Sequence, residues 1–294
     1  MEVIVDIAKP GSGAADDPYL VCTAEQLNLI RGGTGYGSLS AHYRLGADID
    51  LSLTYSDKNP WQPIGNSATP FTGHFDGNHH VISNVHIFQA TSYAGLFGAI
   101  QNAEVKNLKL IIRRCVGDKY VGALAGASIS SAISFCGVED DGARMPVERL
   151  VSSDQGYCGG LVGENKGRIN NCYATINVGG LFECYGGLVG VNDGTISCSY
   201  AAGTVSGIHD YFGGLVGVNK GIIINCYTVG QVLSVKGLHH GGIVGRNNFG
   251  SIRNCYHAIG EVFPDEDEYS FGIGWGGQPD LSFLITCSYF NIVK

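Results

Sequence analysis

GGLVGENKGRINNCY begins at Gly159, GGLVGVNDGTISCSY at Gly186, GGLVGVNKGIIINCY at Gly213 and GGIVGRNNFGSIRNCY at Gly241, so one motif is written four times. The copies begin 27, 27 and 28 residues apart, and a fixed period of this size is typical of repeat architectures. Each copy has paired glycines, a short aliphatic step, an Asn-x-Gly or Asn-x-x-Gly turn and a β-branched run. We expect the glycines and asparagines to form corners through positive φ. Short strands without helical periodicity predict one coil of a parallel β-solenoid per copy.

Three columns extend the repeat beyond these copies. The first is aliphatic and predicts an inward ladder: Ile82, Val105, Ile133, Ile169, Ile196, Ile223, Ile252 and Ile285. The second, three residues further on, is Val85, Leu108, Cys136, Cys172, Ser199, Cys226, Cys255 and Ser288. The third lies between them and predicts a ladder of side-chain amides: Asn84, Asn107, Phe135, Asn171, Cys198, Asn225, Asn254 and Cys287. The columns predict an all-β, right-handed parallel β-helix of about eight coils, its hand following the rule for parallel connections.

The repeat favours a single elongated domain over residues 1–294. We expect residues 1–41 to hold an N-terminal strand at Glu2–Ile7 and a capping helix, residues 42–94 the first coils, and residues 95–294 the regular repeats. Thr23-Ala24-Glu25-Gln26 is a capping box that opens the short helix. Such a helix would cover the open face of the first coil, because an uncovered sheet edge invites pairing with other chains.

Composition excludes several classes of protein. Glycine makes up 45 of 294 residues and charged residues only 15%, against a usual charged share of about 25%. The net charge of −8 leaves no basic footprint for nucleic acid. No apolar run is long enough for a transmembrane helix. We also expect the protein to be a monomer.

The ten cysteines do not resemble a disulfide framework. Cys136, Cys172, Cys226 and Cys255 share a column with Val and Leu, which indicates buried free thiols. Cys158 and Cys184 stand before glycine pairs, so a bridge between neighbouring coils stays an alternative for these two.

An aromatic or imidazole residue stands just before each glycine pair: Tyr93, Tyr120, Tyr157, Tyr185, Tyr211 with Phe212, His239 with His240, and Tyr269. The loops before these residues vary in length, which places the column along one edge of the rod. Two interpretations stay open. The rings could stack on sugar rings or contact a protein, which makes them the candidate ligand-binding residues, or they could stack on each other and seal the edge.

The acidic residues do not form a pattern that predicts catalysis. Glycoside hydrolysis needs two facing carboxylates, and β-elimination needs a base with a cation or metal. Asp48, Asp50 and Asp76 are the best-placed acids, and we interpret them as turn and cap residues. The run Asp265-Glu266-Asp267-Glu268 lacks an EF-hand spacing. No catalytic residue, metal or cofactor is therefore predicted, and a groove with two converging carboxylates would be the feature that favours an enzyme.

The GGLVG and GGIVG cores resemble the GLUG motif of bacterial surface proteins. Asp17–Leu20, Thr23–Leu27, Ala47–Leu51 and Phe75–Asn78 resemble the segment that precedes those repeats, so the resemblance spans roughly residues 16–290. It implies an exported module for adhesion or display on a bacterial cell, in some relatives a lipoprotein, with a host or cell-surface glycan or protein as partner. Such modules also form non-catalytic parts of immunoglobulin A metallopeptidases, whose His-Glu-x-x-His motif is absent here.

Met1–Pro10 lacks the features of a signal peptide, so the resemblance implies that an export signal was removed. The sequence is compatible with three functions: a non-catalytic surface module, a carbohydrate-binding protein that uses the aromatic edge, and a polysaccharide-active β-helix enzyme.

Overall fold

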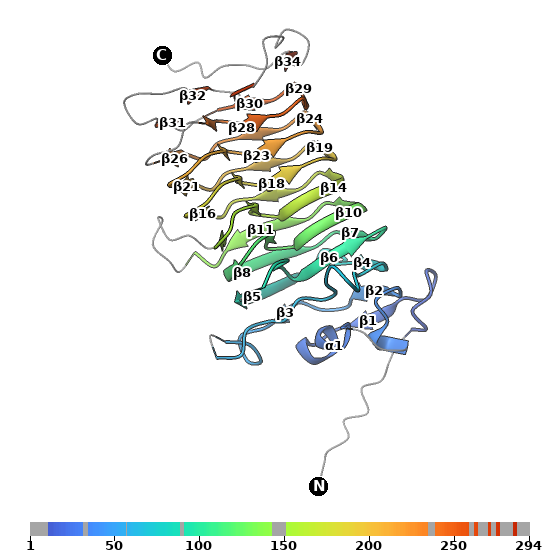
Figure 1. Cartoon of the computed structure of the whole chain (residues 1–294). Helices are drawn as coiled ribbons and strands as arrows, with labels where there is room; N and C mark the ends of the chain where they lie inside the picture. Colours follow the sequence, from blue (N-terminus) through green and yellow to red (C-terminus); the bar gives the residue numbers. More distant parts are fainter. Residues whose placement is uncertain are drawn as a thin grey trace.

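The chain forms a parallel β-solenoid of about eight turns, as the repeat predicts, and successive turns stack along one axis (Figure 1). The computed structural model describes residues 11–258 except 32–34, 57, 89–90, 143–150 and 235–238, together with strand residues 262–263, 270–271, 275–276 and 285–286. The expected strand at Glu2–Ile7 lies outside these residues.

Three parallel sheets form the walls of the solenoid. The first sheet contains β1 (Tyr19–Val21), β2 (His42–Leu45), β4 (His74–Asp76), β6 (Phe97–Gln101), β7 (Glu104–Lys106), β10 (Ala125–Ser134), β14 (Val162–Asn170), β18 (Val189–Asn192), β19 (Thr195–Ser197), β23 (Val216–Asn219), β24 (Ile222–Ile224), β28 (Val244–Asn247), β29 (Ser251–Arg253), β33 (Trp275–Gly276) and β34 (Ile285–Thr286). The second sheet contains β3 (Ile49–Asp50), β5 (Val81–Phe88), β8 (Lys109–Gly117), β11 (Gly137–Asp140), β12 (Val151–Ser153), β15 (Tyr173–Ala174), β16 (Val178–Gly180), β20 (Tyr200–Ala201), β21 (Val205–Gly207), β25 (Tyr227–Thr228), β26 (Val232–Ser234), β30 (Tyr256–His257) and β31 (Val262–Phe263). The third sheet contains β9 (Val121–Gly122), β13 (Cys158–Gly159), β17 (Tyr185–Gly186), β22 (Phe212–Gly213), β27 (His240–Gly241) and β32 (Ser270–Phe271).

The aliphatic ladder lies in the first sheet, with one correction. Val105, Ile133, Ile169, Ile196, Ile223, Ile252 and Ile285 pair in register from coil to coil, as predicted. Ile82 instead belongs to the second sheet, between Ile49 and Leu110. Phe75 takes the predicted place beside Val105, because the first coils are longer and spacing alone could not fix their register.

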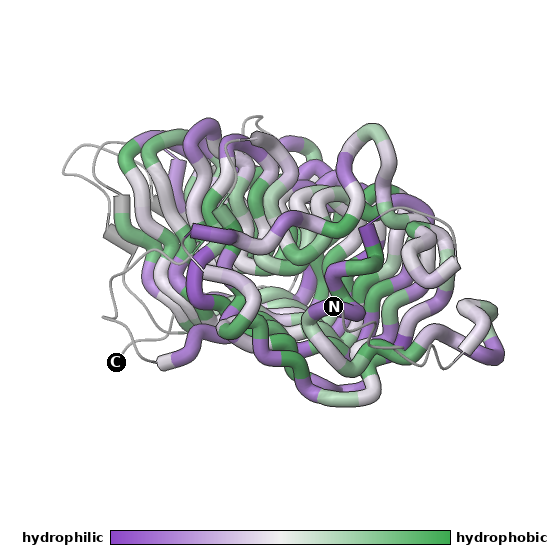
Figure 2. Tube along the Cα trace, turned by 90° about the horizontal axis from the view of Figure 1, so that it is seen from below, coloured by the Kyte–Doolittle hydropathy of each residue, from purple (hydrophilic) through white to green (hydrophobic). Residues whose placement is uncertain are grey.

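The aliphatic step of each motif fills the solenoid interior. Both of its residues are fully buried in all four copies: Leu161, Val162, Leu188, Val189, Leu215, Val216, Ile243 and Val244. The view from the N-terminal end shows hydrophobic segments recurring at matching places in successive coils (Figure 2). Each coil therefore buries its apolar side chains against its neighbours.

The third glycine of each motif, which ends the GGLVG or GGIVG core, permits close packing rather than positive φ, and this corrects the expectation from sequence. A Cβ on Gly190 would lie 2.7 Å from the carbonyl carbon of Tyr157, and one on Gly217 would lie 2.7 Å from that of Cys184. Real Cβ atoms do not approach backbone so closely, so these positions need glycine. Within the described coils, positive φ falls mainly on non-glycine residues.

The Asn-rich column is a column of corners. Asn107, Asn171, Asn225 and Asn254 have φ between 50° and 54°, which asparagine tolerates better than most residues. Asn84 shares the conformation but lies at a register shift in β5. Among the described residues, the expected amide ladder is reduced here to one link, in which Asn254 Nδ2 donates to Asn225 Oδ1 over 3.1 Å.

A buried amide ladder forms instead from the asparagine of each Asn-x-Gly turn. Asn165 donates to Asn192 over 2.8 Å, Asn192 to Asn219 over 2.9 Å, and Asn219 to Asn247 over 2.8 Å. All four side chains are buried. Stacked identical corners place one amide above the next, and the bonds satisfy polar groups that burial would otherwise penalise.

The nine cysteines that the structure describes are free thiols. Cys136, Cys172, Cys226 and Cys255 are buried, as predicted. Cys158 and Cys184 are joined only through backbone, since the Cys158 amide donates to the Cys184 carbonyl over 3.0 Å. The alternative of a bridge between them is thus not realised.

A short helix closes the N-terminal end of the rod (Figure 1). Helix α1 (Ala24–Leu29) begins at the N-cap Thr23, and Gln26 completes the predicted capping box. Leu27 and Ile30 join the solenoid core, whereas Leu29 is 47% exposed. The helix therefore covers the first coil with only part of its apolar sequence.

Candidate functional site

The candidate aromatic residues separate into an outer and an inner column. Tyr93, Tyr120, Tyr157, Tyr211 and His239 are half-buried at one corner of the coils. We call these residues, with Cys184 at the intervening rung, the corner column. Tyr269 lies outside the described residues.

Tyr185, Phe212 and His240 form the inner column and pair in register in the third sheet. They are 0%, 0% and 1% exposed, so they cannot contact an external ligand and are removed from the candidate site. Neighbouring residues of a strand point to opposite faces. The Tyr211 side chain therefore lies at the corner of the coil, whereas the adjacent Phe212 side chain is buried in the interior.

The corner column holds its residues in an uncommon backbone conformation. The φ angles of Tyr93, Tyr120, Tyr157, Cys184 and Tyr211 lie between 57° and 70°. This region costs a non-glycine residue about 1–3 kcal/mol unless its surroundings impose it. The glycine-lined backbone of the next strand packs behind this corner, so the fold imposes the conformation and aims each side chain outward.

Within the corner column, neighbouring rings cover each other's faces. The ring centroids of Tyr93 and Tyr120 are 5.0 Å apart, those of Tyr120 and Tyr157 5.1 Å, and those of Tyr211 and His239 5.2 Å. Burial raises the pKa of Tyr120 and Tyr157, which keeps both hydroxyls neutral. Rings with a neighbour on each side expose edges and hydroxyls, so stacking on a sugar needs a break in the column.

Cys184 is that break. Its short side chain stands between Tyr157 and Tyr211 and forms a small buried cluster with Val191 and Val218, against which both tyrosines pack. A recess of about 280 Å³ opens over this cluster, and we call it the Cys184 recess. It is lined by Tyr157, Glu183, Cys184, Val191, Tyr211, Val218, Lys220, Arg246 and Asn248.

The charges around the Cys184 recess are mainly positive. The Arg246 guanidinium carbon lies 5.2 Å from the Tyr211 ring centroid, and its Nη1 donates to the Tyr211 hydroxyl over 3.1 Å. Lys119 Nζ lies 4.6 Å from the Tyr157 ring. Burial, then Glu183, raises the pKa of the Cys184 thiol to about 12, against the opposing fields of Lys220, Arg246 and Lys119. The thiol is therefore a neutral part of the floor.

A second recess, of about 450 Å³, lies on the first sheet near the N-terminal end and is called the N-terminal recess. His42, Arg44, His74, Asp76, Glu104 and Lys106 line it together with Ala15, Asp16, Pro18, Tyr43 and Phe75. Three carboxylates, those of Asp16, Asp76 and Glu104, thus line one groove. The sequence singled out only Asp76 of these, as a turn or cap residue. Strand pairing brings the groups together from β2, β4 and β7.

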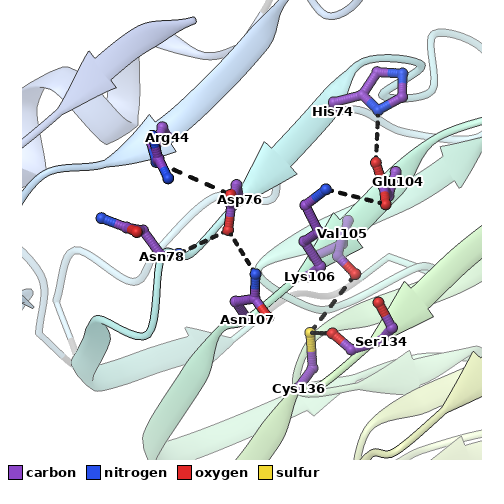
Figure 3. Close-up of polar contacts among 10 residues, drawn as sticks. All are labelled: Arg44, His74, Asp76, Asn78, Glu104, Val105, Lys106, Asn107, Ser134 and Cys136. Carbon is purple, nitrogen blue, oxygen red and sulfur yellow. Dashed lines mark hydrogen bonds and ion pairs between the residues drawn. The ribbon is translucent and has the colours of Figure 1, made fainter. Parts of the chain in front are cut away.

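Charged groups of the N-terminal recess are largely engaged with each other (Figure 3). His74 Nδ1 lies 3.0 Å from Glu104 Oε2, and Lys106 Nζ lies 3.3 Å from Glu104 Oε1. The hydrogen bond from His74, then that from Lys106, lowers the pKa of Glu104 despite partial burial. Asp76 accepts from the Asn78 amide over 2.9 Å and from Asn107 Nδ2 over 3.0 Å. Both carboxylates therefore act as acceptors in a network.

An imidazole pair completes the recess. The rings of His42 and His74 stack 4.2 Å apart and 4° from parallel. Burial, then the charge of His74, lowers the pKa of His42, so this ring is neutral at pH 7. Within the described residues, no cluster of three or more His, Cys, Asp or Glu side chains is arranged to hold a metal ion.

The structure also shows a tyrosine stack that the sequence reasoning missed. Tyr173, Tyr200, Tyr227 and Tyr256 lie 5.2, 4.9 and 5.3 Å apart on the second sheet, within 9° of parallel. Their signal was the tyrosine that ends every quoted copy of the motif. Because these four rings follow one another without a gap, they expose edges rather than faces.

Comparisons with known proteins find similarity to segments of much larger proteins. A "Putative Gly-rich membrane protein" of Evansella cellulosilytica is 40% identical over 103 residues, which span 34% of this chain and 12% of that protein. "Halomucin" of Haloquadratum walsbyi is 31% identical over 164 residues, or 52% of this chain and 2% of that protein. The chain thus spans a small part of either relative. No family model matches the chain.

The fold is shared with a solved structure. The crystal structure of a putative immunoglobulin A1 protease from Bacteroides ovatus superposes with a TM-score of 0.63 and 21% sequence identity, covering 90% of this chain and 85% of that chain. No helix in the part of the chain that the structure describes is long and apolar enough to cross a membrane. The chain therefore has the β-solenoid fold of that structure and resembles parts of proteins named for a membrane location and as a halomucin.

Proposed function

We propose that this chain is a non-catalytic module on the surface of a bacterial cell, where it serves adhesion or display. The observation that carries the proposal is the continuous parallel register of the first sheet from β1 to β34. At about 4.8 Å per coil, this register makes a rod on the order of 40 Å long. Such a rod holds surface groups at fixed positions away from its point of attachment.

The similar proteins support this location. Their names refer to a membrane protein and a halomucin, and the matched segments form small parts of long chains. A solenoid suits such chains, because coils can be added along one axis without a new core. The GLUG-like motif points the same way, as it resembles repeats of exported surface proteins. The proposed partner is a glycan or protein of a host or neighbouring cell.

The non-catalytic part of the proposal rests on the N-terminal recess. Glycoside hydrolysis needs one carboxyl group that holds a proton at working pH. Glu104 has a lowered pKa and is ionised at neutral pH, while Asp76 is held by two hydrogen-bond donors and lies 4.0 Å from Arg44. The ionised Glu104 supplies no general acid, and the contacts of both groups favour a structural role in the first coils.

Two experiments test the proposal. Antibodies raised against the chain should label intact cells of the source organism as strongly as permeabilised cells, and label confined to permeabilised cells would contradict a surface location. Incubation of the chain with a panel of soluble polysaccharides should release no new reducing ends or unsaturated products. Product release that disappears in Glu104→Gln would establish an enzyme in place of a binding module.

A further inference from the structure

We propose that the Cys184 recess binds a single pyranose ring that carries a carboxylate, such as a terminal uronic acid of a glycan. The proposal deepens the surface role proposed above by naming a ligand class and a site. It starts from the one rung of the described corner column, from Tyr93 to His239, that carries neither an aromatic ring nor an imidazole.

The break exposes ring surface that the rest of the column hides. Tyr157 is covered by Tyr120 on one side, at 5.1 Å, and Tyr211 by His239 on the other, at 5.2 Å. Between Tyr157 and Tyr211 stands only Cys184, whose side chain is too short to reach the outer part of either ring. The recess is therefore walled by Tyr157 on one side and by Tyr211 with Arg246 on the other.

The width of the break favours a puckered, saturated ring. Tyr157 and Tyr211 are two coils apart, about 10 Å at the usual strand spacing. A flat aromatic guest would need only about 7 Å, because carbon atoms make contact at 3.5–4.0 Å. A pyranose chair, with axial hydrogens on both faces, occupies more of the remaining space and presents C–H groups to the electron-rich face of a tyrosine.

The recess has an apolar floor and a polar rim, which is the arrangement that a sugar-binding site requires. Cys184, Val191 and Val218 form an apolar floor that is 5%, 3% and 8% exposed. Polar groups stand at the rim, where Glu183, Lys220, Arg246 and Asn248 line the opening. Such sites combine a mainly apolar surface with a few directed polar groups.

The charge balance selects an acidic sugar. Arg246 and Lys220 lie on the rim, and Lys119 stands over Tyr157 at 4.6 Å. The opposing carboxylates are Glu183, on the rim, and Asp193, which lies 3.5 Å from Lys220. Arg246 is fixed by the Tyr211 hydroxyl and lines the recess. A ligand carboxylate in the recess would bind the remaining guanidinium donors, and guanidinium binds carboxylate with favourable geometry.

A matched pair of sugars tests the proposal on the whole chain. Methyl β-D-glucuronide and methyl β-D-glucoside differ only at C6, where the first has a carboxylate and the second a hydroxymethyl group. Saturation-transfer NMR with titration gives their dissociation constants. We expect the glucuronide to bind with Kd on the order of 1–10 mM and the glucoside about tenfold more weakly. Arg246→Gln should bring the two sugars to equal affinity, and Tyr157→Ala should abolish binding of both.

Cys184→Tyr completes the column and closes the recess. Tyrosine already adopts the required backbone conformation at the adjacent rungs, with φ of 59° at Tyr157 and 67° at Tyr211 against 65° at Cys184. This variant should therefore fold, with an unchanged circular dichroism spectrum, and lose glucuronide binding by more than tenfold. Tyr227→Ala is the matched control, since it removes a stacked tyrosine from the second sheet, and its affinity should equal that of the original chain.

Three results would overturn the proposal: no glucuronide binding up to about 50 mM, equal affinity for both sugars before mutation, or unchanged binding in folded Cys184→Tyr. If Cys184→Tyr fails to fold, the responses of Arg246→Gln and Tyr157→Ala decide. Failure of sugar binding with normal labelling of intact cells would reject this site and leave the display role standing.

Discussion

Replacement of Asn192 by alanine tests whether the buried amide ladder stabilises the rod. Asn192 accepts from Asn165 Nδ2 over 2.8 Å and donates to Asn219 Oδ1 over 2.9 Å. It also accepts from the Gly194 amide and donates to the Gly194 carbonyl, both over 3.3 Å. Asn192 thus joins three neighbours through one side chain.

The expected loss follows from the groups left behind. Asn165 is fully buried. Its Nδ2 would keep only a 3.5 Å contact with the Gly167 carbonyl and so loses its good acceptor, whereas its Oδ1 still accepts from the Gly167 amide over 3.1 Å. A buried polar group without a partner costs about 1–3 kcal/mol, and a lost hydrogen bond about 1 kcal/mol. Gly194 is half-buried and can turn to water. We expect Asn192→Ala to lower the free energy of unfolding by about 3 kcal/mol.

Urea unfolding with linear extrapolation measures this change, and coincident curves from circular dichroism and tryptophan fluorescence check that one transition is observed. Asn170→Ala is the matched control, because Asn170 is half-buried in the neighbouring coil, donates to Ser197 Oγ over 2.7 Å and accepts from the exposed Asn171 side chain. It should cost less than about 1 kcal/mol. Asn192→Ala with Asn219→Ala should cost less than the sum of the two single changes, since they share one bond. Equal costs for Asn192→Ala and Asn170→Ala would refute the ladder as a source of stability.

Three further predictions follow from individual groups. Tyr185→Phe should lower the free energy of unfolding by about 1 kcal/mol in the same urea assay, because the Tyr185 hydroxyl donates to the Ser153 carbonyl over 3.0 Å. Phe212→Tyr, at the next rung, should not raise the free energy of unfolding. An unchanged free energy in Tyr185→Phe would contradict the assignment. Glu104 has a lowered pKa in the folded chain, so its stabilising effect is complete above its unfolded pKa and is lost as pH falls through the lower folded value. Urea midpoints between pH 7 and pH 3 should therefore fall less steeply in Glu104→Gln than in the original chain, and parallel curves would refute the role of the His74 contact. Cys198 is exposed whereas Cys136 and Cys172 are buried, so Cys198→Ser should remove one equivalent from the fast phase of reaction with a thiol reagent; an unchanged fast phase would show that another thiol reacts there.

The sequence was sufficient for the architecture because the period and the aliphatic column are written directly in it. Ile169, Ile196 and Ile223 lie in register as predicted. It failed at Ile82, because the first coils differ in length and two ladders are possible there. The roles of two sets of asparagines were exchanged: Asn171 belongs to the column expected to form the ladder and takes positive φ, whereas the turn residue Asn192 forms the ladder. Glycine at Gly190 permits close packing, which a sequence pattern does not separate from positive φ.

The candidate site was only partly accessible for a related reason. A column read from sequence cannot show which of two adjacent residues points outward, so Tyr185 and Phe212 were grouped with Tyr157. The Cys184 recess arises from what one rung lacks, and an absent ring leaves no signal of its own in a motif search. The N-terminal recess depends on pairing between distant segments, His42 with His74 and His74 with Glu104, which no local pattern records.

The missing ring at Cys184 also bears on how a periodic molecule can be addressed. A rod built from nearly identical coils offers a ligand many equivalent binding positions, and therefore no preferred one. Among the described coils from Tyr93 to His239, the omitted ring at Cys184 makes one position along the rod different from the others. Duplication of a 27-residue coil on either side would lengthen the rod. It would move the recess further from the point of attachment without altering the recess itself.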